Sequence, residues 1–243
     1  MTTTINADTV VGGAVVTADA SGVLGLQAAG NTGITLNSSR AIGVGASPSY
    51  GTSGQVLTSA GSAAAPTWTT PSAGALVFIS TTTASGSAVT LDITSGFSST
   101  YDDYLLLGEN ITLNASNFYR MRVYLGGTLQ TSGYAYNWIN VSSSVGTFRY
   151  TGDSSMDLND TMNGSTTISS FQMYIQNVNT STKSQISCQT TQSDGTTVSG
   201  NNQARAAGGC TNAGSLTGIR IYTQNGTSVF STGTFRLYGI SKS

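Results

Sequence analysis

Short runs in which apolar and polar residues alternate predict β-strands throughout the second part of the chain. The clearest run covers residues 118–125. A period of two sorts this run into an apolar face, Tyr119, Met121, Val123 and Leu125, and a more polar face, Phe118, Arg120, Arg122 and Tyr124. Such alternation indicates a strand that buries one side and exposes the other to solvent.

Comparable runs recur from residue 75 to the end of the chain. They cover residues 76–79, 88–93, 104–107, 134–138, 171–175, 184–188, 219–222 and 234–238. Turn-forming Gly, Ser and Asn separate these runs, and no proline follows residue 71. Together they predict an all-β fold for residues 75–243, an antiparallel β-sandwich that is jelly-roll-like.

Residues 1–74 follow a different pattern, in which shorter apolar alternations recur about every eight to ten residues. They are Val15–Val16, Leu24–Leu26, Ile34–Leu36 and Ile42–Val44, and the turn-like segments ADASG, AAGNTG and NSSR lie between them. A repeat with one short strand cannot bury its apolar side unless neighbours stack on it. Another surface must therefore cover this part of the chain.

Three copies of the same chain are the simplest cover, because a threefold stalk brings identical apolar stripes together and satisfies strand edges between chains. We therefore predict a homotrimer, with a short intertwined trimeric β-stalk and an attachment region in residues 1–74. Residues 75–243 are then the domain expected to bind a receptor. The alternative is that residues 1–74 form a flexible leader rich in Gly, Ser and Ala.

Composition narrows the class of partner. Only 8% of the residues are charged and the net charge is -1, so no cluster of Lys or Arg predicts contact with nucleic acid. The first residues, MTTTINADTVV, show neither the basic nor the apolar region of a signal peptide. No apolar stretch is long enough to span a membrane, and we expect no membrane insertion.

The residues available for chemistry are few. The chain has no histidine, which removes the commonest general base and zinc ligand, and no phosphate-binding glycine motif predicts a cofactor. A glycan depolymerase would need two suitably spaced carboxylates. The adjacent Asp102 and Asp103 fit a turn better than a catalytic pair. We therefore expect no enzyme, no cofactor and no catalytic residue.

Two further groups of residues have alternative interpretations. Asp153, Asp157 and Asp160 lie in TGDSSMDLND, which fits a solvated loop better than a calcium site because the spacing is not that of an EF-hand. Cys188 and Cys210 fit two buried free thiols better than a disulfide, although pairing stays open.

A receptor site needs aromatic faces for the apolar side of a sugar ring and polar groups for its hydroxyls. The segment SGYAYNWIN supplies both types in Tyr134, Tyr136, Asn137 and Trp138. If this segment is a strand, the three aromatic residues share one face, and the alternative is that this face belongs to the core. The polar segment 193–203 is a second candidate, because binding residues concentrate on loops.

One segment carries a family resemblance. The run GQVLTSAGSAAAPTW at residues 54–68 resembles a segment of the form SGQVLTSxGxGxxPxW in tail fibre and other structural proteins of tailed bacteriophages. The preceding repeats resemble the β-repeat stretch that often lies before it. The closing Gly233–Ile240, GTFRLYGI, resembles the last strand of many such proteins.

The resemblance implies a tail fibre of the virion, made in the host cytoplasm, that mediates attachment to a host surface glycan or protein. It also implies contacts between the N-terminal region and other tail or adaptor proteins of the virion. The sequence has no obvious long anchoring domain before the repeats, which leaves a head fibre or capsid decoration protein as the alternative.

Overall fold

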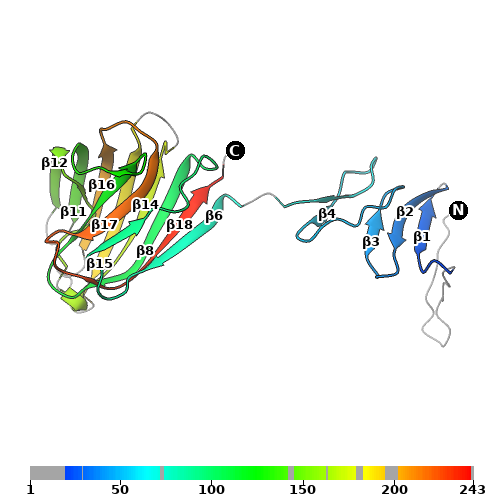
Figure 1. The fold of residues 1–243 in the computed structure, drawn as a ribbon, viewed down its shortest axis with the longest axis horizontal. Helices are drawn as coiled ribbons and strands as arrows, with labels where there is room; N and C mark the ends of the chain where they lie inside the picture. Colours follow the sequence, from blue (N-terminus) through cyan, green and yellow to red (C-terminus); the bar gives the residue numbers. More distant parts are fainter. Residues whose placement is uncertain are drawn as a thin grey trace. The chain divides into compact units, whose positions relative to one another are not determined.

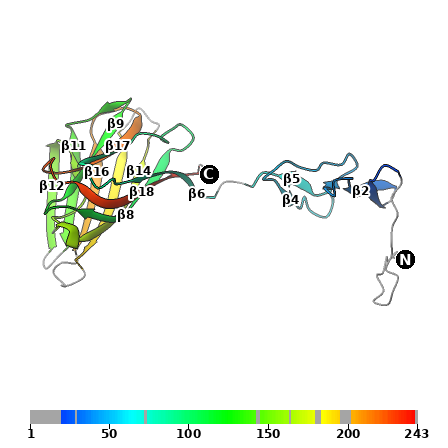
Figure 2. The same ribbon diagram turned by 60° about the horizontal axis from the view of Figure 1, so that its bottom comes forward.

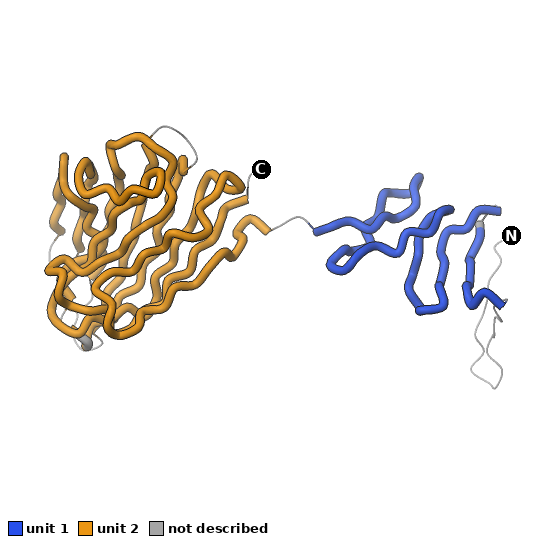
Figure 3. Tube along the Cα trace, in the orientation of Figure 1, with its two compact units in different colours: residues 1–72 blue, residues 73–243 orange. Residues whose placement is uncertain are grey.

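The computed structural model describes residues 20–28, 30–71, 74–141, 145–162, 164–178, 183–194 and 202–241. The chain divides into two compact units, residues 1–72 and 73–243 (Figure 3). The sequence analysis placed this division after residue 74. Within the described residues the only helical segment is the short 3-10 turn Gly164–Thr166, and none is long and apolar enough to cross a membrane.

The first unit contains a three-stranded antiparallel sheet. Its strands are β1 (Leu24–Ala28), β2 (Asn31–Leu36) and β3 (Ile42–Val44), and consecutive strands pair (Figure 1). Three of the predicted apolar alternations lie in these strands. The fourth, Val15–Val16, lies outside the described residues.

A separate hairpin follows in the first unit, and it contains the segment that resembles phage proteins. Strands β4 (Val56–Thr58) and β5 (Thr67–Thr69) pair antiparallel. The Trp68 indole donates a hydrogen bond to the carbonyl of Ser49 at 2.9 Å and lies against Gly51. Gly51 has a φ of 65°, a conformation that glycine adopts without strain.

The second unit contains an eight-stranded antiparallel sheet, which runs from β12 to β6 across Figure 1. In spatial order its strands are β12 (Val145–Asp153), β11 (Tyr134–Val141), β16 (Asn202–Cys210), β15 (Gln185–Ser193), β14 (Ile168–Gln176), β8 (Asp103–Leu113), β18 (Phe230–Ile240) and β6 (Leu76–Thr83). We call this the large sheet. Its first strand in the sequence, β6, pairs with its last, β18.

A smaller sheet covers one face of the large sheet (Figures 1 and 2). Its spatial order is β10 (Thr128–Leu129), β9 (Tyr119–Leu125), β17 (Leu216–Thr223) and β7 (Thr90–Ile93), and β13 (Met156–Asp157) also pairs with β9. We call this the small sheet. The predicted all-β, antiparallel fold is confirmed, and the arrangement is that of a β-sandwich.

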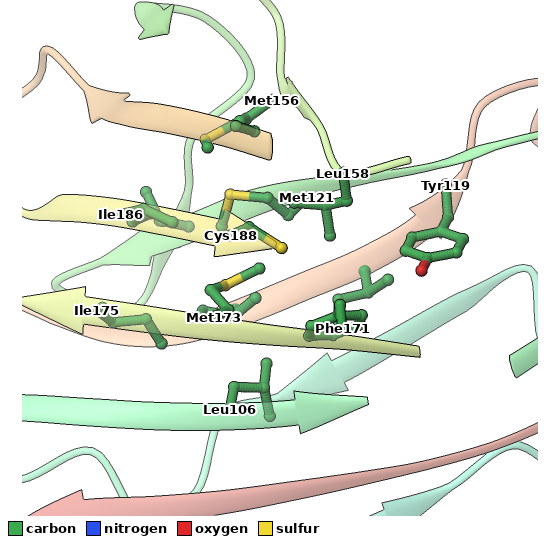
Figure 4. Close-up of a cluster of buried hydrophobic side chains, with 14 of the residues drawn as sticks. Leu106, Tyr119, Met121, Met156, Leu158, Phe171, Met173, Ile175, Ile186 and Cys188 are labelled. Carbon is green, nitrogen blue, oxygen red and sulfur yellow. The ribbon is translucent and has the colours of Figure 1, made fainter. Parts of the chain in front are cut away.

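The core lies between the two sheets (Figure 4). Met121 and Met156 of the small sheet and Phe171, Met173 and Cys188 of the large sheet are all buried. On β9 the buried positions alternate as predicted, with the arginines on the outer face. Cys188 and Cys210 are both buried and unpaired, and burial raises the pKa of the Cys188 thiol to about 12.

The small sheet places its charges on its outer face, where they pair. Arg220 binds both carboxylate oxygens of Asp92 at 2.7 Å, and this contact holds the pKa of Asp92 below its usual value. The Arg122 guanidinium lies over the ring of Tyr222, 4.8 Å from its centroid. These contacts let the apolar side chains of β9 and β17 face inward together.

A substitution at Gly108 measures how tightly the side chains pack against the large sheet. A Cβ atom at this position would overlap the ring of Phe171, which is buried against Tyr119 and Phe235. We expect Gly108→Ala to lower the free energy of unfolding by about 1–3 kcal/mol, because the ring must leave its position. Denaturant unfolding followed by circular dichroism measures the loss.

A second substitution is the control for Gly108→Ala. Phe171→Leu shortens the side chain that the new methyl group meets, so the double variant should lose less stability than the sum of the two single variants. Additive losses would show that Gly108 and Phe171 do not compete for the same space.

Candidate functional site

The structure separates the four residues that the sequence proposed as a receptor site. Tyr134, Tyr136 and Trp138 of β11 point toward the small sheet and are buried, whereas Asn137 is exposed on the opposite face. The hydroxyl of Tyr134 accepts a hydrogen bond from the Val123 amide at 2.8 Å and donates one to a backbone carbonyl. Tyr134 is therefore a core residue, as the alternative interpretation stated.

Tyr136 and Trp138 form the buried half of a larger aromatic cluster. In the register between β11 and β12, Tyr150 lies opposite Tyr136 and Phe148 lies opposite Trp138. The rings of Tyr136 and Tyr150 stack with centroids 4.8 Å apart, and those of Trp138 and Phe148 are 5.4 Å apart. We call these four residues the aromatic ledge.

The ledge reaches solvent because the two sheets differ in width. Strand β13 packs over β11 and β16, while β12 is the edge strand of the large sheet. As a result Trp138 is 9% exposed, whereas its neighbour Phe148 is 49% exposed and Tyr150 is half-buried. Phe148 and Tyr150 were not among the residues predicted from the sequence, although the alternation in VGTFRY predicts a strand by the same rule that found β9.

The segment 153–160 borders the ledge, and the prediction that it forms a solvated loop is wrong. Ser155 through Asn159 are buried, since Met156 and Leu158 point into the core. The side chain of Asn159 accepts a hydrogen bond from the Tyr119 amide at 2.8 Å, which fixes the segment to β9. The apolar residues between the acids were the signal for this burial.

The three acids of this segment have separate contacts. Asp153 accepts a hydrogen bond from the Ser154 amide, Asp157 pairs with Arg120 at 2.5 Å, and Asp160 accepts one from the Asn140 side chain at 2.5 Å. Within the described residues no group of three or more His, Cys, Asp or Glu side chains is placed to hold a metal ion. The structure therefore gives no support to a calcium site here.

The remaining sequence candidates lie elsewhere. Asp103 is the first residue of β8 and accepts a hydrogen bond at 3.1 Å from the amide of Asn177, which is distant in the sequence. Of the polar segment 193–203, Ser193 ends β15, and Asn202 and Gln203 begin β16. Residues 195–201 lie outside the described part of the chain.

The charged groups beside the ledge carry an excess of negative charge. Burial raises the pKa of Asp157, and the Arg120 guanidinium and the Tyr136 hydroxyl oppose that rise. Burial and the nearby carboxylates also raise the pKa of Tyr136 and Tyr150. Within the segment 153–160, three carboxylates outnumber the guanidinium groups of Arg120 and Arg122 that bind it.

Several polar atoms near the ledge lack hydrogen-bond partners although they are buried. They are Nε1 of Trp138, Oδ1 of Asn140, Oγ of Ser155 and Nδ2 of Asn159. A buried polar atom without a partner costs about 1–3 kcal/mol. The exposed aromatic surface of the ledge thus lies near buried polar atoms that have no hydrogen-bond partner.

The outer face of the large sheet offers a second surface of different character. A shallow hollow crosses β8, β14 and β15 and is lined mainly by polar side chains, including Glu109, Gln172, Gln189 and Thr191. Glu109 pairs with Arg236. The lining has no exposed aromatic platform, so the aromatic ledge is the better candidate for a binding site.

Comparisons with known proteins give no further assignment. No protein-family model matches the chain, and no curated protein or solved structure is significantly similar to it.

Arg120 allows a test of the charge balance at this site. Arg120→Ala leaves the largely buried Asp157 without its partner, and we expect a loss of about 2–4 kcal/mol in the free energy of unfolding at pH 7. The loss should shrink toward pH 4. Burial raises the pKa of Asp157 and the Arg120 guanidinium lowers it, so without Arg120 burial raises that pKa further, and the folded variant takes up the proton at a higher pH than the folded parent.

Chemical denaturation at pH 7 and pH 4 measures the effect of Arg120→Ala. The control is the double variant Arg120→Ala/Asp157→Asn, in which no unpaired carboxylate remains, and its stability should change little between the two pH values relative to the parent. An equal loss at both pH values for the single variant would contradict the account.

Proposed function

We propose that this chain is a trimeric tail fibre protein of a tailed bacteriophage and that it mediates attachment to the host cell surface. The observation that carries the proposal is an aliphatic face in the first unit, four side chains of which are exposed among the described residues. The resemblance of residues 54–68 to phage structural proteins supports the assignment to phage virion proteins. The aromatic ledge is a surface suited to binding a receptor.

The aliphatic face lies on one side of the sheet β1–β2–β3. Its six residues form two rows across the strands, Leu24, Leu36 and Ile42 in one and Leu26, Ile34 and Val44 in the other. Within these rows Leu26, Ile34, Leu36 and Ile42 are exposed, whereas Val44 at the end of one row is buried. On the opposite side of the sheet, Gly43 is covered by Pro48 and Tyr50.

A three-stranded sheet with an exposed aliphatic side has little stability of its own. Apolar area removed from water contributes about 25 cal/mol per Å², and the exposed side chains of this sheet remain in contact with solvent. Two further copies of the chain can cover it, since identical faces meet at a threefold axis. We therefore infer an intertwined trimeric β-stalk in the first unit.

We also infer a jelly roll in the second unit. The chain passes from the large sheet to the small sheet and back at β6, β7, β8 and β9, and the last strand β18 lies between β6 and β8. Interleaving of early and late strands in two sheets is expected of the paired Greek keys of a jelly roll.

In this function the first unit binds other tail or adaptor proteins of the virion, and the second unit binds the host surface. Its alternative is a head fibre or capsid decoration protein, which would use the same stalk and need no receptor. A glycan depolymerase is a lesser alternative. These alternatives differ in what the purified trimer binds, so a binding experiment can distinguish them.

The first test is the mass of the purified chain by light scattering. We expect three times the 24.8 kDa of one chain. Leu26→Ser/Ile42→Ser places two hydroxyls on the aliphatic face and should shift the mass toward one chain. The matched control is Ile168→Ser, because all three residues are 49% exposed but Ile168 lies in the second unit. A monomeric parent would remove the basis for the stalk.

The second test is labelling of candidate host cells with the fluorescent trimer. We expect labelling that saturates and that unlabelled trimer competes away. A trimer that binds purified virions or capsids and labels no host would favour the decoration role. New reducing ends in host polysaccharide after incubation would favour the depolymerase.

A further inference from the structure

We propose that the aromatic ledge binds an uncharged sugar ring of a host surface glycan, stacked on Phe148 and Tyr150. This inference rests on the proposed function, because it names the class of receptor that the fibre recognises. Three features of the ledge carry it: the arrangement of the rings, the unused polar atoms and the local charge.

The rings form a supported platform. Tyr150 stacks on the buried Tyr136 with an interplanar angle of 19°, and Phe148 and Tyr150 also stack, with an interplanar angle of 28° and centroids 6.4 Å apart. Trp138 packs beside Phe148. Buried rings thus hold the exposed ones in place, and an aromatic face provides the apolar surface that the C–H groups of a pyranose require.

Polar atoms with unused hydrogen-bonding capacity lie beside this platform. Nε1 of Trp138 is a donor without a partner, and Oδ1 of Asn140, two positions along the same face of β11, is an acceptor without one. Asn140 also contacts the carboxylate of Asp160. Both atoms are buried beneath the surface of the ledge. Sugar hydroxyls both donate and accept hydrogen bonds, so a hydroxyl that reaches these atoms would supply the missing partners.

The negative charge beside the ledge favours neutral sugars over acidic ones. Asp153, Asp157 and Asp160 outnumber the two arginines that bind their segment, and Arg149 of β12 projects from the opposite face of the sheet. A carboxylate or phosphate on the ligand would meet a negative potential. A neutral sugar would meet carboxylate acceptors instead, and therefore we assign the ledge to uncharged glycans.

Three copies of a shallow site suit a repetitive polymer. One stacked ring with a few hydrogen bonds gives weak affinity, while three ledges on one trimer raise the overall affinity when the ligand can engage them together. The ledge therefore needs no deep pocket to retain a polysaccharide on a cell surface.

Tryptophan fluorescence gives a direct reporter of the ledge. The chain has two tryptophans, Trp68 in the first unit and Trp138 in the ledge, so Trp68→Phe leaves a single reporter at the proposed site. An array of neutral and acidic oligosaccharides first identifies a bound sugar. The neutral oligosaccharide with the highest signal is then titrated into the Trp68→Phe trimer, and we expect a saturable change in Trp138 emission.

Substitutions on the ledge should then separate stacking from folding. Phe148→Ala should weaken the oligosaccharide about tenfold, because it removes one stacked ring. Phe148→Tyr keeps the ring and should retain binding. The matched control is Phe78→Ala, since Phe78 is 56% exposed on β6, the other edge strand of the same sheet. Light scattering and circular dichroism confirm that each variant remains a folded trimer.

The outcomes distinguish this inference from the proposed function. If the trimer labels cells but binds only acidic sugars or none, or if Phe148→Ala binds as well as Phe78→Ala, the assignment of the ledge is wrong and the fibre function stands. If Phe148→Ala dissociates the trimer, the ledge is a contact between subunits and the assignment is wrong. If the ledge binds the sugar but no host is labelled, the proposed function fails instead.

Discussion

The large, small and three-stranded sheets each have an apolar face, and the need to keep these faces from water explains most of the structure. In the second unit two faces cover one another, so Met121, Met156 and Met173 meet in a dry core. In the described part of the first unit, four side chains on the aliphatic side of the three-stranded sheet are exposed. The difference explains why one unit has a complete core within a single chain and the other calls for additional copies.

The unequal width of the two sheets gives the second unit its binding surface. A sandwich of equal sheets would bury Phe148 as it buries Tyr119. Here the large sheet extends by one edge strand beyond its cover, and the same inner face continues from core into solvent. The aromatic ledge is therefore an extension of the core that the small sheet does not reach, and its rigidity comes from the packed rings beneath it.

The sequence predicted the class of fold and many strands, because β9 and its neighbours alternate with a clear period of two. It missed β16, whose inward residues include Ala204 and Ala206. These positions are small because Trp138 lies directly opposite Ala206, and that complementarity depends on a pairing between strands distant in the sequence. The segment around Asp157 was misassigned for a related reason, since its burial depends on contacts with β9.

The position of the last strand has a consequence for how the protein is made. Strand β18 lies between β6 and β8, so residues from the two ends of the second unit share one stretch of sheet. During synthesis β6 emerges first and has no neighbour until residues 230–240 leave the ribosome. The large sheet is therefore complete only once residues 230–240 have been made. A chain that stops before them lacks the strand between β6 and β8 and keeps open sheet edges, which are templates for pairing with other chains.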